Sequence, residues 1–343
     1  KTSGVVKLRR YTGRKALLIS CNWKWNGILY MEHKYGDLNS SSRVYELTGI
    51  NGECLGTCFT SDGRSILVCG NDPQILLFQN YESSKHGISM QGHTKAVLEV
   101  SMNKQHGLQF SSCSADKTVR YWDIETLKCI SKFKGHTKIV NSCKCSNTLI
   151  ISGSDDGQVR AWDTRIKQNK ACVYKYDNKY PITAVSCEGE LFRVFAGGID
   201  NSIYMIDMRI STAFTLSTLN DTITGLDVSP DNSFLVSNSM DNQVVIWDIR
   251  PHSDLQDRKM GTLVGAKHNF EANLHRVRWN FDGDLLAAAS SDTIIYIWSF
   301  KHKKLINKLV GHKGATLDIS FHPSLPIIAS AGSDGRVIVG EFI

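Results

Sequence analysis

The sequence predicts an all-β fold in which seven β-sheets stack radially into a propeller, and three observations lead to this prediction. An aspartate in a turn-like context recurs at intervals of 40 to 51 residues, and short runs rich in β-branched residues flank it. Glycine, at 27 of 343 residues, supplies turns between short strands. A repeat of roughly 40 residues forms one small sheet that needs neighbours to bury both of its faces. The seven turn aspartates are Asp72, Asp116, Asp156, Asp200, Asp241, Asp292 and Asp334.

The repeat is most complete in residues 135–165. Residues 148–154 and 158–163 are runs of β-branched and small residues, and Asp156-Gly157 between them suits the positive-φ turn of a hairpin. Six residues after each turn aspartate stands the position that Trp162 occupies in this repeat. In chain order that position holds Phe78, Trp122, Trp162, Ile206, Trp247, Trp298 and Gly340.

In a complete repeat, a histidine, a serine, the turn aspartate and the tryptophan are expected to form one chain of hydrogen bonds. The carboxylate would hold the imidazole, and the serine would join the ring to the indole N–H. An unpaired buried polar group costs about 1–3 kcal/mol, so such chains stabilise a blade. Unit six is expected to use His268 but has Ala288 in the serine position, and units one, four and five lack the Gly-His pair. The predicted network residues are His93, Ser112, Asp116, Trp122, His136, Ser152, Asp156, Trp162, His312, Ser330 and Asp334.

The last repeat is expected to be completed from the start of the ring. The sequence ends at Ile343, directly after the third predicted strand of unit seven. Residues 43–47 alternate as a strand does, so we expect them to pair with that last sheet and remove its exposed edge. The longest interval between turn aspartates contains the polar stretch 251–258, which is expected to be a surface loop.

The chain is expected to divide into a basic N-terminal arm, residues 1–42, and the propeller, residues 43–343. The arm holds eight Lys and Arg against two acidic residues, together with aromatic residues, whereas the propeller holds 32 Lys and Arg against 31 acidic residues. We therefore expect RNA to be touched, if at all, only through the arm. The alternative is that the arm packs its aromatic side chains against the propeller.

Nothing in the sequence points to catalysis, a cofactor or a metal. There is no run of about 18 apolar residues and no basic-then-apolar leader, so a soluble intracellular protein without membrane contact is expected. The ten cysteines include no Cys-x-x-Cys pair and are expected to be small buried hydrophobic residues. Residues 87–92 have phosphate-loop spacing, but His93 stands where lysine is needed. We expect no catalytic, cofactor-binding or metal-binding residue and no small-molecule substrate.

The contact expected between His136 and Asp156 places the loop that enters a blade on the same rim as the turn between the blade's second and third strands. Residues beside these positions are expected to be exposed. Apolar side chains in such a set favour a protein interface, while the alternative is that some of them fill the central channel. The predicted partner-binding rim comprises Leu98, Ala115, Ile139, Asn141, Asp155, Ile199, Met240 and Leu317.

These features resemble the WD40 repeat family, in which Gly-His and Trp-Asp pairs bracket each unit as they do in residues 135–163. A narrower resemblance covers residues 43–343 and is to the WD40 subunits of the U5 small nuclear ribonucleoprotein. It rests on segments such as 134–137, 153–157 and 268–271. This resemblance implies a nuclear, non-catalytic scaffold of pre-mRNA splicing that contacts the particle's large central scaffold protein and its RNA helicase. It does not extend to the arm.

A second class of scaffold remains open. Arg165, Arg209 and Arg250 each follow an aspartate by two residues, which resembles the Trp-Asp-x-Arg boxes of substrate receptors in cullin–RING ubiquitin ligases. In that class the arginines contact an adaptor propeller. The alternative is that each arginine pairs with its acidic neighbour, an exposed contact that contributes little to stability.

Overall fold

The computed structural model describes residues 44–82, 86–103, 107–166, 170–189, 193–251, 258–271 and 273–342, apart from the side chains of residues 217 and 218. The basic arm expected at residues 1–42 lies outside the described residues, as do residues 252–257 of the expected surface loop. The described residues form strands without an α-helix, so they contain no helix that could cross a membrane.

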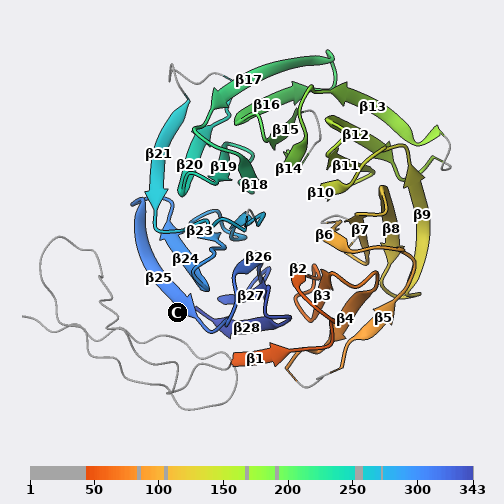
Figure 1. Ribbon diagram of the computed structural model, residues 1–343, viewed down its shortest axis with the longest axis vertical. Coiled ribbons are helices and arrows are strands. Elements are labelled where there is room, and N and C mark those ends of the chain that lie inside the picture. Colours follow the sequence, from red (N-terminus) through yellow and green to blue (C-terminus); the bar gives the residue numbers. More distant parts are fainter. Residues whose placement is uncertain are drawn as a thin grey trace, which may run out of the picture. The chain divides into compact units, whose positions relative to one another are not determined.

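Seven antiparallel four-stranded sheets form the blades of a propeller, and first strands such as β6 and β14 lie nearest the centre (Figure 1). This confirms the predicted seven-bladed, all-β fold. The strands are β2 (Cys54–Phe59), β3 (Ser65–Gly70), β4 (Ile75–Gln79) and β5 (Ile88–Met90) in blade one; β6 (Val97–Met102), β7 (Gln109–Ser114), β8 (Thr118–Asp123) and β9 (Lys128–Lys134) in blade two; β10 (Val140–Ser146), β11 (Leu149–Ser154), β12 (Gln158–Asp163) and β13 (Cys172–Asp177) in blade three; β14 (Ile182–Cys187), β15 (Arg193–Gly198), β16 (Ser202–Asp207) and β17 (Thr212–Thr218) in blade four; β18 (Ile223–Val228), β19 (Phe234–Ser239), β20 (Gln243–Asp248) and β21 (Lys259–Val264) in blade five; β22 (Val277–Trp279), β23 (Leu285–Ala288), β24 (Ile294–Ser299) and β25 (Lys304–Val310) in blade six; and β26 (Thr316–Phe321), β27 (Ile327–Gly332), β28 (Val337–Glu341) and β1 (Val44–Leu47) in blade seven.

The ring is closed by β1, the strand expected at residues 43–47. Val44 pairs with Gly340 of β28, and Leu47 pairs with Val337, in an antiparallel ladder. The first described strand therefore supplies the outer strand of the last blade, as predicted. Because the ring is closed, every blade has a neighbour on both faces. The pairing with β1 also covers the edge of β28, and an uncovered edge of this kind is prone to aggregation.

The core lies between adjacent blades. Trp122 of blade two packs against Cys69 and Leu77 of blade one, and Trp162 of blade three packs against Cys113 and Val119 of blade two. Each of these tryptophans is fully buried, as a large hydrophobic side chain in a stabilising core position must be. In blades two and three the tryptophan therefore joins the blade to the preceding one.

Blade six departs from the repeat where the chain enters it. A side chain at Gly265 would press against Tyr296 and approach Trp298, just as one at Gly92 would press against Trp122 in blade two. Gly265 therefore holds the glycine position of the Gly-His pair. The next residue, Ala266, is buried and takes the place expected for histidine.

The assignment of His268 to that histidine position is therefore wrong. Its Nε2 lies 3.4 Å from Asn238 Oδ1 of blade five, while Asp292 accepts a hydrogen bond of 2.7 Å from the hydroxyl of Tyr296. The reason is an insertion, because the connection after Ala266 is long and β22 begins only at Val277. A tyrosine has replaced the histidine chain in this blade.

Candidate interaction site

Blade three carries the complete chain of hydrogen bonds expected from the sequence. His136 Nδ1 lies 3.0 Å from Asp156 Oδ2, and its Nε2 lies 2.8 Å from Ser152 Oγ. Trp162 donates its indole N–H to the same serine oxygen at 2.8 Å. The structure brings together the corresponding residues of two further blades, His93, Ser112, Asp116 and Trp122 in blade two and His312, Ser330 and Asp334 in blade seven.

In blades two and three the chain favours the neutral form of its histidine, because burial lowers the pKa of both His93 and His136. Burial lowers the pKa of His136, and its hydrogen bond to Asp156 only partly opposes this effect. Burial alone would raise the pKa of Asp156, but His136 and the backbone N–H of Thr137 lower it well below its usual range. A neutral ring donates from Nδ1 to the carboxylate and accepts the hydroxyl of Ser152 at Nε2. Both ring nitrogens are therefore engaged, which leaves neither of them to act as a general base.

Other blades use shorter substitutes for this chain. In blade four, Asp200 accepts hydrogen bonds from the hydroxyl of Tyr204 at 2.6 Å and from Asn178 Nδ2 at 3.3 Å. In blade five, the indole of Trp247 donates to Ser237 Oγ at 2.9 Å. The turn aspartate or the tryptophan is thus satisfied locally in blades that lack the Gly-His pair.

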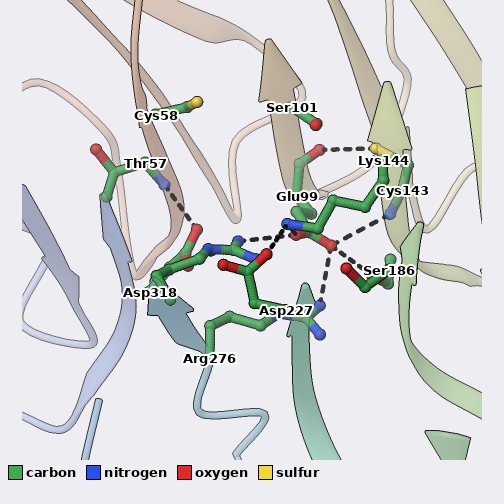
Figure 2. Close-up of polar contacts among 12 residues, drawn as sticks. Thr57, Cys58, Glu99, Ser101, Cys143, Lys144, Ser186, Asp227, Arg276 and Asp318 are labelled. Carbon is green, nitrogen blue, oxygen red and sulfur yellow. Dashed lines mark hydrogen bonds and ion pairs between the residues drawn. The ribbon is translucent and has the colours of Figure 1, made fainter. Parts of the chain in front are cut away.

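The first strands of the blades also build a polar cluster at the centre of the ring (Figure 2). Two sets of equivalent positions, fixed by the register with each second strand, contribute to it. Each set combines three charged side chains with four small ones, and the small residues leave room for the long ones. The first set is Gly56, Glu99, Ser142, Ala184, Gly225, Arg276 and Asp318, and the second is Cys58, Ser101, Lys144, Ser186, Asp227, Arg278 and Ser320.

Arg276 of blade six reaches across the centre of the ring. Its guanidinium donates to the backbone carbonyls of Asn141 at 2.7 Å, Thr183 at 3.1 Å and Thr224 at 3.0 Å, which belong to blades three, four and five. Its Nη2 also lies 3.5 Å from Glu99 Oε2 of blade two. One side chain therefore links five blades.

The remaining charges of the cluster are paired across blades. Arg278 Nη2 lies 2.8 Å from Glu99 Oε1 and 3.0 Å from Asp318 Oδ1. Lys144 Nζ lies 3.4 Å from Glu99 and 3.8 Å from Asp227. With Arg276, three cations face three anions, so the cluster presents no excess of either charge to a ligand.

Glu99 is the hub of this cluster. Burial alone would raise its pKa, but Arg276, Lys144 and Arg278 together lower it well below its usual range, so the side chain is a carboxylate. The hydroxyl of Ser142 also donates to it at 2.6 Å. A buried charge is tolerated only when it is paired and hydrogen-bonded in this way. The cluster is therefore a structural plug of the propeller centre.

Sequence reasoning missed this cluster. Its charged members are Glu99, Lys144, Asp227, Arg276, Arg278 and Asp318. The sequence did contain one signal, which was a charged residue in some repeats at a position where the other repeats hold a small residue. Because each partner lies on a different blade, only a comparison of all seven first strands could have revealed the pairing.

The predicted partner-binding rim is exposed in part. Ile139 in the loop entering blade three is 38% exposed, and Ile199 in the turn of blade four is 47% exposed. Tyr180, which the sequence analysis did not single out, is 43% exposed in the loop entering blade four. Leu98, Ala115, Asp155 and Met240 are partly exposed. Ile139, Tyr180 and Ile199 form an apolar border on the rim of blades three and four.

Two members of that predicted set are buried, and the expectation of their exposure is wrong. Leu317 is 3% exposed, and Asn141 donates from Nδ2 to Asp155 Oδ1 at 2.6 Å and to the Ile182 carbonyl at 2.9 Å. Both are second residues of first strands, where the pairing register shifts at a bulge. Such a residue faces the neighbouring blade instead of the rim.

The possible adaptor-binding arginines are each tied to their own aspartate. Arg165 pairs with Asp163 at 2.7 Å, and its side chain remains 69% exposed. Arg209 pairs with Asp207 at 2.8 Å, and Arg250 pairs with Asp248 at 2.6 Å. Their binding to an adaptor stays a prediction, because an exposed pair of this kind is also what an isolated strand end would form.

Among the described residues, no group of three or more His, Cys, Asp or Glu side chains is arranged to hold a metal ion. Most of the described cysteines are buried or partly buried free thiols, although Cys172 is exposed. Burial raises the pKa of Cys54 to about 12, with a contribution from Asp334. Such a thiol is not a nucleophile at neutral pH.

Comparison with known proteins identifies the relatives of this chain. The family model described as "WD domain, G-beta repeat" matches residues 84–123, 127–163, 213–248, 261–299 and 303–339. The U5 small nuclear ribonucleoprotein 40 kDa protein of Dictyostelium discoideum is 36% identical over 303 residues, covering 87% of this chain and 84% of that protein. The protein of the same name from Homo sapiens is 38% identical over 223 residues, covering 64% of this chain and 61% of that protein. Pre-mRNA-splicing factor cwf17 of Schizosaccharomyces pombe is 34% identical over 300 residues, covering 86% of each.

Proposed function

This chain belongs to the WD40 repeat family and, within it, to the U5 small nuclear ribonucleoprotein 40 kDa proteins, and we propose that it is a non-catalytic, protein-binding scaffold of the spliceosome in the nucleus. The observation that carries this proposal is the similarity over 303 residues to the Dictyostelium protein, because it spans most of the propeller and not one repeat alone. The similarity to a pre-mRNA-splicing factor of fission yeast supports the same process.

The proposed partners are proteins of the U5 particle, namely its large central scaffold protein and its RNA helicase. The exposed part of the rim supports a protein partner, since Ile139, Tyr180 and Ile199 lie on one rim and are 38%, 43% and 47% exposed. Apolar residues surrounded by polar ones are typical of protein interfaces. Contact with snRNA is proposed only for residues 1–42.

A scaffold role fits the use that the fold makes of its titratable groups. The histidines of blades two, three and seven have both ring nitrogens in hydrogen bonds, and the central carboxylates are paired with arginine or lysine. Groups that are fully engaged in stabilising the fold are poor candidates for proton transfer. The proposed scaffold function therefore depends on the surface of the propeller.

Affinity purification of the tagged full chain from nuclear extract tests the proposal. We expect U5 proteins, including the large scaffold protein and the helicase, to be recovered well above a tag-only control. Recovery of a cullin–RING adaptor instead would support the role of Arg165, Arg209 and Arg250. In that case, replacing the three arginines with alanine would abolish recovery of the adaptor, whereas recovery of U5 proteins would be unaffected by the same change.

A further inference from the structure

A basic patch occupies the rim of blades two and three, although the propeller as a whole is nearly neutral. Four exposed lysines form it, Lys95, Lys117, Lys134 and Lys138. The Lys117 N–H donates to the carbonyl of Ser114, whose hydroxyl in turn donates to the carbonyl of Lys95 at 3.2 Å. Lys134 pairs across the ladder with the residue that follows Lys117, and Lys138 lies in the next loop. The lysines are therefore neighbours on one surface.

In the described part of the propeller, the carboxylates near this patch do not pair with its lysines. Among the described residues, none of the four lysines forms an ion pair. The nearby Asp116 and Asp156 remain negatively charged, because the histidines that they bind are neutral, but their side chains are only 4% and 3% exposed. Asp155, on the same rim, accepts a hydrogen bond from Asn141.

Two arginines of blades two and three add to the positive charge of the four lysines, one of them buried (Arg120) and the other half-buried (Arg160). Arg120 lies over Trp122, and Arg160 lies over Trp162, in cation–π contacts. Arg160 donates to Gln158, a neutral partner. Residues 91–160 contain ten Lys and Arg against six Asp and Glu. This segment thus carries more than the whole net charge of the propeller.

We propose that this basic patch binds an acidic, extended polypeptide segment of a protein in the splicing particle. That the partner comes from the splicing particle rests on the proposed function. That the partner is acidic and extended is inferred from the patch itself. Lysines on flexible stems suit carboxylates spread along a chain, and the exposed Ile139 beside them offers a site for an apolar side chain of the same segment.

The patch is less suited to single-stranded RNA. Binding of that kind relies on aromatic rings on which bases stack, worth about 1–3 kcal/mol per base. Within the described parts of blades two and three, no aromatic side chain is among the exposed large hydrophobic residues. The ring at the border, Tyr180, has Lys179 Nζ stacked over it at 5.5 Å.

The test measures fluorescence anisotropy of a fluorescein-labelled Glu-Glu-Leu repeat peptide with the full chain, its Lys95→Glu/Lys138→Glu variant and a Lys301→Glu/Lys304→Glu control. The control makes the same change in charge at exposed lysines in and after the turn before β25 of blade six. We expect the patch variant to lose at least about tenfold in affinity, with salt weakening the remaining binding, and the control to match the wild type. Thermal midpoints of all three proteins show whether each is folded, and a Lys95→Gln/Lys138→Gln variant replaces the first if it is not.

Equal loss in both variants would overturn the proposal, because net charge alone would then explain binding. Tighter binding of a labelled single-stranded oligouridylate than of the peptide, lost in the same patch variant, would also overturn it. The proposed function fails separately, if the wild-type chain recovers no U5 components. The inference alone fails under a different outcome, in which the wild-type chain recovers U5 components. In that outcome the patch variant binds the peptide as tightly as the wild type does and recovers the same amount of U5 components.

Discussion

The guanidinium of Arg276 in blade six donates a hydrogen bond of 2.7 Å to the backbone carbonyl of Asn141 in blade three. The two residues are 135 positions apart in sequence, and the bond crosses the centre of the ring. Together with the contacts of Arg276 to blades two, four and five, it makes one residue a shared support of five blades. The stability of the ring should therefore be sensitive to this position.

Replacing Arg276 with methionine is expected to lower the free energy of unfolding by about 3–5 kcal/mol, because Glu99 loses a cation in a buried site and the carbonyl acceptors lose their donor. Chemical denaturation measures this change. The matched control is Arg165→Met, which removes an exposed arginine and should leave the denaturation midpoint unchanged. A variant Arg276→Met as stable as the control would contradict the role of the central cluster.

The chain of hydrogen bonds in blade three predicts a difference between two equivalent serines. Ser152→Ala leaves both Trp162 Nε1 and His136 Nε2 without a partner, whereas Ser237→Ala in blade five leaves only the indole of Trp247. Each unsatisfied buried group costs about 1–3 kcal/mol, so the first variant should have the lower thermal midpoint. Equal midpoints would mean that the histidine adds nothing to the chain.

The fold should lose stability as the pH falls from 7 to 5. Burial lowers the pKa of His136 in the folded state, and burial together with His275 lowers the pKa of His268 to about 3. The unfolded chain, with a histidine pKa of about 6.5, then binds more protons than the folded one, so acid favours unfolding. Below about pH 4 the lowered pKa of Asp156 adds to the loss in the same direction.

Thermal midpoints at pH 7 and pH 5 measure this loss. In His136→Gln one buried neutral histidine is removed, so the decrease between the two pH values should be smaller than in the wild type. A midpoint that rises on acidification would show that the histidines are charged in the folded protein.

Two truncations separate closure of the ring from the role of the arm. Removal of residues 1–47 deletes β1 and exposes the edge of β28, so it should lower the thermal midpoint sharply and promote aggregation. Removal of residues 1–42 keeps β1, and we expect a nearly unchanged midpoint but weaker incorporation into the particle. A large loss of stability in the shorter truncation would assign the arm to the fold.

The rim prediction uses matched substitutions on opposite rims. Ile139→Glu with Ile199→Glu should leave the circular dichroism spectrum unchanged and abolish association with U5 proteins, because charges replace exposed apolar contacts. Phe281→Glu with Leu325→Glu makes the same change at exposed residues in connections between first and second strands. Normal association of the first variant, or equal loss in the second, would rule out this rim as the main contact surface.

The features that local sequence determines could be predicted. The seven turn aspartates and the alternation of residues 43–47 indicated the blades and the closing strand, because turns and strands are set by neighbouring residues. The residues of the polar chains in blades two and three followed from a fixed spacing within one repeat. Turns, strands and polar chains that are fixed by spacing within one repeat could therefore be predicted from the sequence.

Features that depend on contacts between blades could not be reached in this way. His268 was assigned to the wrong position because the insertion before β22 shifts the repeat. The expectation that Leu317 lies at the surface is wrong because a bulge turns its side chain toward the neighbouring blade, where it is buried. The pairing of Arg278 with Glu99 and Asp318 joins residues from three blades and has no local signal.

The most direct test of the account is the amount of U5 snRNA recovered with the tagged full chain from nuclear extract, relative to U1 snRNA. A component of the U5 particle should enrich U5 snRNA strongly over U1 snRNA, and the Ile139→Glu/Ile199→Glu variant should reduce that enrichment. Equal recovery of the two RNAs, or recovery no greater than with the tag alone, would contradict the assignment of this propeller to the U5 particle.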